Sequence, residues 1–352
     1  MKKINPMKFL ATILILFNAF VLKAQISTNE LPVSFHHNIE ISEQTFEINL
    51  PAVNNDSLRI LDSISQQDGA YNFAIPIRVS KNLLNDETCV LIEDSIRICR
   101  IKLISDLSHA SFIIFDDFYL AKGSKLFAYN EDKSQTLGAF TYRNNKPYGR
   151  FSIGPVIDDH IILEYVEPKN FTGKSRIHVS SFIHSFNEAF NHVVDVVGNP
   201  TFGASQPCNL NVNCPQGNGW CNQRRSVALI VGLHDNDHLI ALCSGSLITN
   251  ERRDSKPYFL TANHCLNQVI GDYTYTPSDF IFIFNYQSDG CNNPQEAPAV
   301  TFTISGATLR ANHCNSDFAL LELSTRPPGN FNTYYNGWDN SSNIPQSGAT
   351  IS

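Results

Sequence analysis

Apolar and polar positions alternate in short runs along most of this chain. From about residue 71 the runs "NFAIPIRV", "ASFIIFDDFYL", "LGAFTYRNN" and "HIILEYVEP" follow one another, separated by Gly, Asn, Asp and Pro. Many short alternating runs with turn residues between them, and little helical periodicity, are typical of a β-sandwich. The pattern therefore predicts an all-β chain whose residues 61–194 form a β-sandwich.

A second group of alternating runs lies nearer the C-terminus: "SVALIVGL", "HLIALCSGSLIT", "PYFLTA", "DFIFIFNYQ" and "DFALLEL". Between the two groups, residues 195–207 contain Gly and Pro and no alternation, which indicates a linker. Residues 25–60 are polar and weakly patterned, and we expect a lead-in segment there. Residues 208–352 are then a separate β unit.

The N-terminus has a different pattern. Lysines precede the apolar run 9–22, and the small residue Ala24 follows it. A basic start, a short apolar core and a small residue predict a cleaved signal peptide over residues 1–24, and hence secretion. A buried N-terminal helix and a membrane anchor are the alternatives, but the run is too short to span a bilayer comfortably.

Composition and charge narrow the function further. Of the 352 residues, 42% are hydrophobic and 17% charged, which fits globular cores. The net charge is −7 and no basic patch stands out, which argues against a nucleic-acid partner. Nothing after the signal peptide resembles a membrane span, so no membrane partner is expected either.

Export changes how the nine cysteines are interpreted. Disulfides persist in oxidising compartments, and an odd count leaves a free thiol, an intermolecular bond or a missing partner. Cys89 and Cys99 flank "VLIEDSIRI" and predict a crosslink within a hairpin.

The stretch "PYFLTANHCL" carries the clearest chemistry in the chain. His264 sits directly beside Cys265, at the end of an apolar run. A general base must be held rigidly because small placement errors are costly. A bond from Cys265 to Cys243 would tie the His turn to a neighbouring strand. A hydrogen-bonded loop histidine without function is the alternative for His264.

The pieces "CNLNVNCPQGNG", "CSGSLITNERRDSKPYFLTANHC", "FNYQSDGC", "SDFALLEL" and "YNGWDN" occur in the right order for a known family. From about residue 203 onward the chain resembles the lysyl endopeptidase family, secreted bacterial serine proteases of the trypsin-like (chymotrypsin) fold. Asn263 departs from the trypsin-like Thr-Ala-Ala-His-Cys pattern. The resemblance implies protein or peptide substrates, no cofactor, and a pro-region before the peptidase.

The resemblance also implies roles for individual residues. His264 matches the general base and Asp317 the carboxylate that orients it; Asp272 and Asp279 are rivals, but neither abuts so apolar a strand. A strand-start cap is the alternative for Asp317. The disulfides implied are Cys243–Cys265 and Cys214–Cys291.

Three further cysteines fit the family pattern poorly. Cys208 matches a cysteine whose partner would lie beyond residue 352. Cys221 and Cys314 have no counterpart and could pair with each other.

The nucleophile is missing from the pattern. The family's serine lies in a Gly-x-Ser-Gly turn well after the aspartate, and no serine here has that setting. We therefore expect residues 208–352 to form the first of two β-barrels, with the second barrel, its serine and its oxyanion hole absent. On this interpretation the chain is a C-terminally truncated protease precursor and is inactive alone.

The linker shows a second departure. No Lys or Arg lies between Arg176 and Arg224. A lysine-specific enzyme could not remove its own pro-region there, so either another protease cuts or the specificity is not for lysine.

The same sequence contains patterns that would fit other functions. In "HDNDH", His234 and His238 could share a helical face as metal ligands, but the segment follows a strand, so no metal is expected. Cys314 beside His313 could be a nucleophile, although a disulfide is favoured in an exported protein. From a different class, the chain could be a non-catalytic remnant or a β-sandwich binding or adhesion protein.

Overall fold

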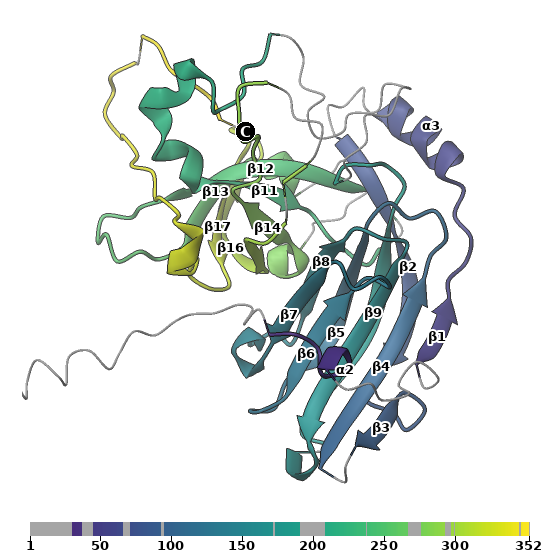
Figure 1. Ribbon diagram of the computed structural model, residues 1–352. Helices are drawn as coiled ribbons and strands as arrows, with labels where there is room; N and C mark the ends of the chain where they lie inside the picture. The colour runs from purple at the N-terminus through teal and green to yellow at the C-terminus, as the bar shows by residue number, and fades with distance from the viewer. Residues whose placement is uncertain are drawn as a thin grey trace, which may run out of the picture.

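The computed structural model is all-β in class, as the alternation predicts (Figure 1). Helices are few among the described residues: α2 spans Val33–His36 and α3 spans Asn55–Ser65, with short 3₁₀ turns elsewhere. No helix in the described part of the chain is long and apolar enough to cross a membrane. The structure describes residues 30–36, 45–65, 71–92, 95–171, 173–190, 208–236, 238–266, 276–292, 297–298, 300–344 and 346–351.

One sheet has six strands in the order β1-β4-β9-β6-β7, with β3 also paired to β4. All its strands lie before residue 170, and only β1 runs parallel to its neighbour. The strands are β1 (Phe46–Asn49), β3 (Cys89–Ile92), β4 (Ile96–Ile104), β6 (Lys125–Tyr129), β7 (Thr136–Phe140) and β9 (His160–Pro168).

The other sheet has eleven strands and extends through both halves of the chain. Its order is β15-β14-β11-β12-β2-β10-β5-β8, with β13, β17 and β16 branching from β12. The strands before the linker are β2 (Tyr71–Asn82), β5 (Ser111–Tyr119), β8 (Phe151–Val156) and β10 (Arg176–Ser185). Those after it are β11 (Val227–Val231), β12 (Ile240–Ile248), β13 (Tyr258–Thr261), β14 (Ile281–Phe284), β15 (Thr303–Ser305), β16 (Ala307–His313) and β17 (Phe318–Leu323).

The described residues 30–190, here called the N-terminal segment, have a core between the two sheets. Apolar side chains of β4, β6 and β9 meet those of β5, β8 and β10 in one buried cluster. Phe118 and Phe151 stack there with ring centroids 4.5 Å apart. Two sheets packed face to face over such a core are a sandwich arrangement.

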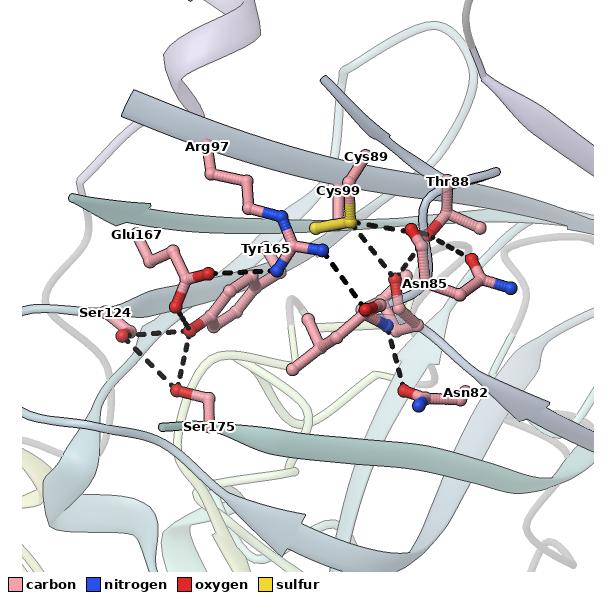
Figure 2. Close-up of a disulfide and its surroundings, with 12 residues drawn as sticks. Asn82, Asn85, Thr88, Cys89, Arg97, Cys99, Ser124, Tyr165, Glu167 and Ser175 are labelled. Atoms are coloured by element: carbon pink, nitrogen blue, oxygen red, sulfur yellow. Dashed lines mark hydrogen bonds and ion pairs between the residues drawn. A yellow bond between two sulfur atoms is a disulfide. The ribbon is translucent and has the colours of Figure 1, made fainter. Parts of the chain in front are cut away.

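Buried charges cross-link the strands of this sandwich (Figure 2). Arg97 on β4 and Glu167 on β9 are directly opposite each other and form an ion pair of 3.1 Å. The Tyr165 hydroxyl donates to the Glu167 carboxylate at 2.7 Å. A disulfide joins Cys89 and Cys99, which face each other in the β3–β4 hairpin. The hairpin crosslink predicted from the sequence is therefore present.

The described residues 208–351, the C-terminal segment, have a core of their own. Phe259, Phe282 and Phe284 pack there with side chains of β11, β12 and β17. In β17 the positions alternate, and Ala319 and Leu321 are fully buried. This alternation lets one face of the strand fill the core, while its N-terminal end stays at the surface.

The lead-in over residues 25–60 holds more structure than its polar composition predicts, because β1 pairs with β4 and Asn54 caps the start of α3. The four-residue strand β1 gives too few positions for a clear period, and α3 runs past the end of this stretch. The expected signal peptide, residues 1–24, and the linker 195–207 lie outside the described residues.

Candidate functional site: a histidine–aspartate pair

The pair His264 and Asp317 lies where two neighbouring strands meet. Strands β13 and β17 are antiparallel, so the end of one lies beside the start of the other, with Thr261 opposite Ala319. His264 follows β13 in the 3₁₀ turn η7 (Asn263–Cys265), and Asp317 directly precedes β17. The two side chains are therefore brought together by strand pairing, although they lie 53 positions apart.

The Asp317 carboxylate accepts two hydrogen bonds from one residue. Its Oδ1 accepts from the backbone N–H of His264 at 2.9 Å, and its Oδ2 from the His264 ring Nδ1 at 2.7 Å. An ionised carboxylate only accepts, so Nδ1 carries a proton, and the neutral form of the ring then has its lone pair on Nε2. These bonds, the backbone one first, hold the pKa of the Asp317 carboxyl below its ordinary value.

The backbone at Asp317 is in the left-handed region, with φ of 48°. Asp is one of the few residues with a side chain that adopt this region readily. Its backbone carbonyl also accepts from the N–H of Asn263 at 3.1 Å. Both the carboxylate and the carbonyl of Asp317 thus hold the His turn.

The far side of the His turn is fixed to β12 and β16. A disulfide joins Cys265 to Cys243 on β12. The side-chain oxygen of buried Asn263 accepts a hydrogen bond from Asn312 on β16 at 2.7 Å. The sequence shows Asn263 as a departure from the trypsin-like pattern, but its partner follows only from the fold.

Both side chains of the pair are exposed to solvent. The side chains are 67% exposed for His264 and 50% for Asp317. Within the described residues, Nε2 of His264 has no hydrogen-bond partner. The arrangement can orient an imidazole and stabilise its protonated form, which are the tasks of a base and its carboxylate in acyl transfer. No hydroxyl of the described residues is bonded to the His264 ring.

The rival carboxylates have other positions. Asp279 is buried and binds Arg150 of the N-terminal segment, and burial raises the pKa of its carboxyl to about 6 against the opposing effect of that arginine. Asp272 lies outside the described residues.

Of the remaining cysteines, two are paired and three are not. Cys214 is bridged to Cys291. Cys208, Cys221 and Cys314 are free and exposed. The pairing of Cys221 with Cys314 considered from the sequence is therefore not formed, and spacing alone could not decide it.

Two groups in the described residues have metal-ligand spacing. Cys243, His264 and Cys265 form one, but both sulfurs are in a disulfide, so neither can be a thiolate ligand. The other joins His160 to its two preceding aspartates at the start of β9. In "HDNDH", Asp235 instead binds Arg150 at 2.9 Å, and residue 237 lies outside the described residues.

Comparisons with known proteins agree with the motifs. Residues 202–352 match the family model described as lysyl endopeptidase, C-terminal domain. The chain is 28% identical over 204 residues to a lysyl endopeptidase of Pseudomonas aeruginosa. That stretch covers 55% of this chain and 40% of the relative, so the chain spans less than half of that protein's length. The chain is thus related to a peptide-bond hydrolase.

Proposed function

We propose that this chain is part of a secreted serine endopeptidase in which His264 is the general base and Asp317 its orienting carboxylate. The observation that carries the proposal is the double acceptance by Asp317, which binds both the backbone and the ring of His264. A catalytic base needs one nitrogen held and the other free toward the reacting group. The relation to a lysyl endopeptidase supports peptide bonds as the substrate, with cleavage after Lys as the narrower proposal.

We assign the nucleophilic serine to a part of the protein other than the residues that the structure describes. Beside the pair, the apolar side chains Leu260 and Phe318 are 40% and 37% exposed at the ends of β13 and β17. A second unit carrying a serine and an oxyanion hole would cover them on packing against this face. In the proposed mechanism, Nε2 of His264 takes the serine proton during attack and returns it to the leaving amine. The imidazolium formed in between is stabilised by Asp317.

The remaining parts of the proposal follow from the cysteines and the fold. Three disulfides fit an oxidising compartment and hence secretion. The sandwich of the N-terminal segment is proposed as the pro-region, a segment that is made with the peptidase unit and packs against it. Residues 1–352 alone are proposed to be inactive, because no hydroxyl among the described residues is bonded to His264.

The first test examines the pair in this chain. In Asp317→Asn the carboxylate becomes an amide, so the hydrogen-bonded Nδ1 proton of His264 should lose its far-downfield NMR resonance. Asp339→Asn, which changes an exposed carboxylate that accepts from Ser341, is the matched control and should keep it. A resonance that survives in Asp317→Asn would refute the assigned tautomer.

The second test measures peptidase activity in the product of the whole gene. Asp317→Asn should lower kcat by about 10⁴ through the wrong tautomer. His264→Ala should remove the activity that depends on the base. Full activity in His264→Ala would reject the function. Burst acylation of residues 1–352 by a serine-directed probe would reject the claim that this chain is inactive alone.

A further inference from the structure

The N-terminal segment joins the C-terminal segment through a shared sheet. Strand β2 pairs with the first part of β12, with Ala74 opposite Ile240 and Tyr71 opposite Leu242. Further along, β12 pairs with β13 instead, from Ser246 onward. The N-terminal segment therefore covers an edge of β12 that would otherwise expose unpaired backbone groups, a liability in soluble proteins.

An apolar cluster continues this contact. Phe73, Phe112 and Phe190 pack edge to face with one another, at centroid distances between 5.5 and 5.9 Å. They belong to the same buried cluster as side chains from β11, the loop after it, β12 and β14 of the C-terminal segment. Those side chains are Val231, Leu233, Ile240, Ile281 and Ile283, each no more than 1% exposed. Separation would expose apolar surface on both sides.

A buried charge is neutralised across the same contact. Arg150, in the loop before β8, binds the Asp279 carboxylate through Nε at 2.9 Å and through Nη2 at 2.8 Å. The same Nη2 binds Asp235 at 2.9 Å. The Asp279 side chain is only 3% exposed. Without Arg150, the C-terminal segment would hold two neighbouring carboxylates with no cation in this position, which is costly for a buried group.

The histidine–aspartate pair lies away from the contact between the two segments. In Figure 1, β13 and β17 lie on the side of the C-terminal segment away from β2. The C-terminal end of β17 approaches the N-terminal segment, where Lys146 donates to the Ser324 hydroxyl at 2.7 Å, whereas Asp317 precedes the opposite end of that strand. Neither His264 nor Asp317 makes a hydrogen bond or ion pair to the N-terminal segment within the described residues. A segment that blocked the site would bury these side chains, yet both remain at least half exposed.

We propose that the N-terminal segment is a permanently bound scaffold of the C-terminal segment, and that a cut in the linker neither releases it nor uncovers His264. This inference rests on the proposed function only in treating His264 as the base. It also accounts for a linker without Lys or Arg: a scaffold that stays bound and leaves the base open does not need to be removed by the enzyme itself.

The test cuts the full chain at one engineered point. A recognition site for a sequence-specific protease replaces part of residues 195–207, and the cut protein is analysed by size-exclusion chromatography at low micromolar concentration. The two pieces should co-elute at the volume of the uncut chain. Separate elution, or precipitation of the C-terminal piece with the other left in solution, would overturn the proposal.

Arg150→Met tests the charged contact. Truncation of one partner in a buried, hydrogen-bonded charge pair typically weakens a complex at least roughly 30-fold. We expect the cut variant to dissociate at concentrations at which the cut parent stays together. Arg176→Met, which removes an exposed pair with Asp117 in the same segment, is the matched control and should still co-elute. Equal retention in both variants would exclude Arg150 as an anchor.

The openness of His264 is measured separately, by its rate of carbethoxylation followed by peptide mass spectrometry. The rate should be equal in uncut and cut protein, and unchanged when the N-terminal piece is displaced by mild denaturant. A several-fold rise on displacement would show that the segment covers the site. If His264 proves not to be a catalytic base, the two pieces should still co-elute. Failure of the proposed function can therefore be told apart from failure of the scaffold proposal.

Discussion

At the residue scale, the candidate site depends on backbone groups as much as on side chains. Asp317 holds the His turn through its carboxylate and its carbonyl, and its left-handed φ aims both at the same turn. A carboxylate that already accepts a backbone N–H is fixed before it meets the imidazole. Such preorganisation is what a base and its orienting group require.

Asn263 is a positioning residue in this arrangement. Its side chain is buried and accepts from Asn312 on β16, so truncation removes the hydrogen bond that ties the His turn to β16. Asn263→Ala should lower the free energy of unfolding by about 1 kcal/mol. Urea denaturation measures this, and amide exchange should be faster in the His turn.

A double-mutant cycle with Asn312→Ala gives the control. Because the two residues share one hydrogen bond, the double variant should lose clearly less than the sum of the single losses. Strictly additive losses would show that the Asn263–Asn312 bond contributes nothing.

At the element scale, charged cross-strand pairs set the register of the sandwich. Arg97 and Glu167 lie directly opposite each other on β4 and β9, and the Arg97 guanidinium also donates to the Leu84 carbonyl at 3.1 Å. The Glu167 side chain is fully buried and the Arg97 side chain is 15% exposed. A slip by one residue between the two strands would place the two charges on opposite faces of the sheet.

Arg97→Met should therefore be strongly destabilising. It leaves the buried Glu167 carboxylate without its cation, a loss of roughly 3–5 kcal/mol in comparable cases. Thermal or denaturant unfolding followed by circular dichroism measures it. Arg176→Met again serves as the control and should change stability by less than about 0.5 kcal/mol, because surface pairs contribute little.

At the scale of the whole molecule, both segments bury a neutral histidine. His184 is fully buried; its Nε2 donates to Asn55 Oδ1 and its Nδ1 accepts from the Ser105 hydroxyl, each at 2.8 Å. Burial, aided by nearby His109, lowers the pKa of His184 to about 4. Burial likewise lowers the pKa of His234 in the C-terminal segment to about 4.

These histidines predict stability that falls with acid. Between pH 6.5 and about 4 the unfolded chain binds protons that the folded chain does not, so the free energy of unfolding decreases as the pH falls. His184 alone should account for roughly 2.5 kcal/mol between pH 7.5 and 4.5.

His184→Gln tests this by the difference between the two pH values. It should reduce the pH dependence, whatever its effect at neutral pH. Ser105→Ala, which removes one partner but keeps the imidazole, should destabilise at neutral pH and retain most of the pH dependence. An unchanged pH dependence in His184→Gln would contradict the assignment.

The sequence by itself determined the all-β class and the local crosslink Cys89–Cys99. Strand alternation repeats every two residues and a hairpin crosslink spans few positions, so both can be read from neighbouring residues. It also pointed to His264 and Asp317, because "TANHC" and "SDFALLEL" are local motifs whose order matched a family.

Only the tertiary structure decided what depends on pairing between distant strands. The partner of Asn263, the role of Asp279 as the counter-ion of Arg150, and the free state of Cys221 and Cys314 all follow from which strands are neighbours. The scaffold contact between β2 and β12 is of the same kind. Side-chain period shows which face of a strand is buried, but it carries no information on what covers that face, and this is why these features could not be predicted from the sequence.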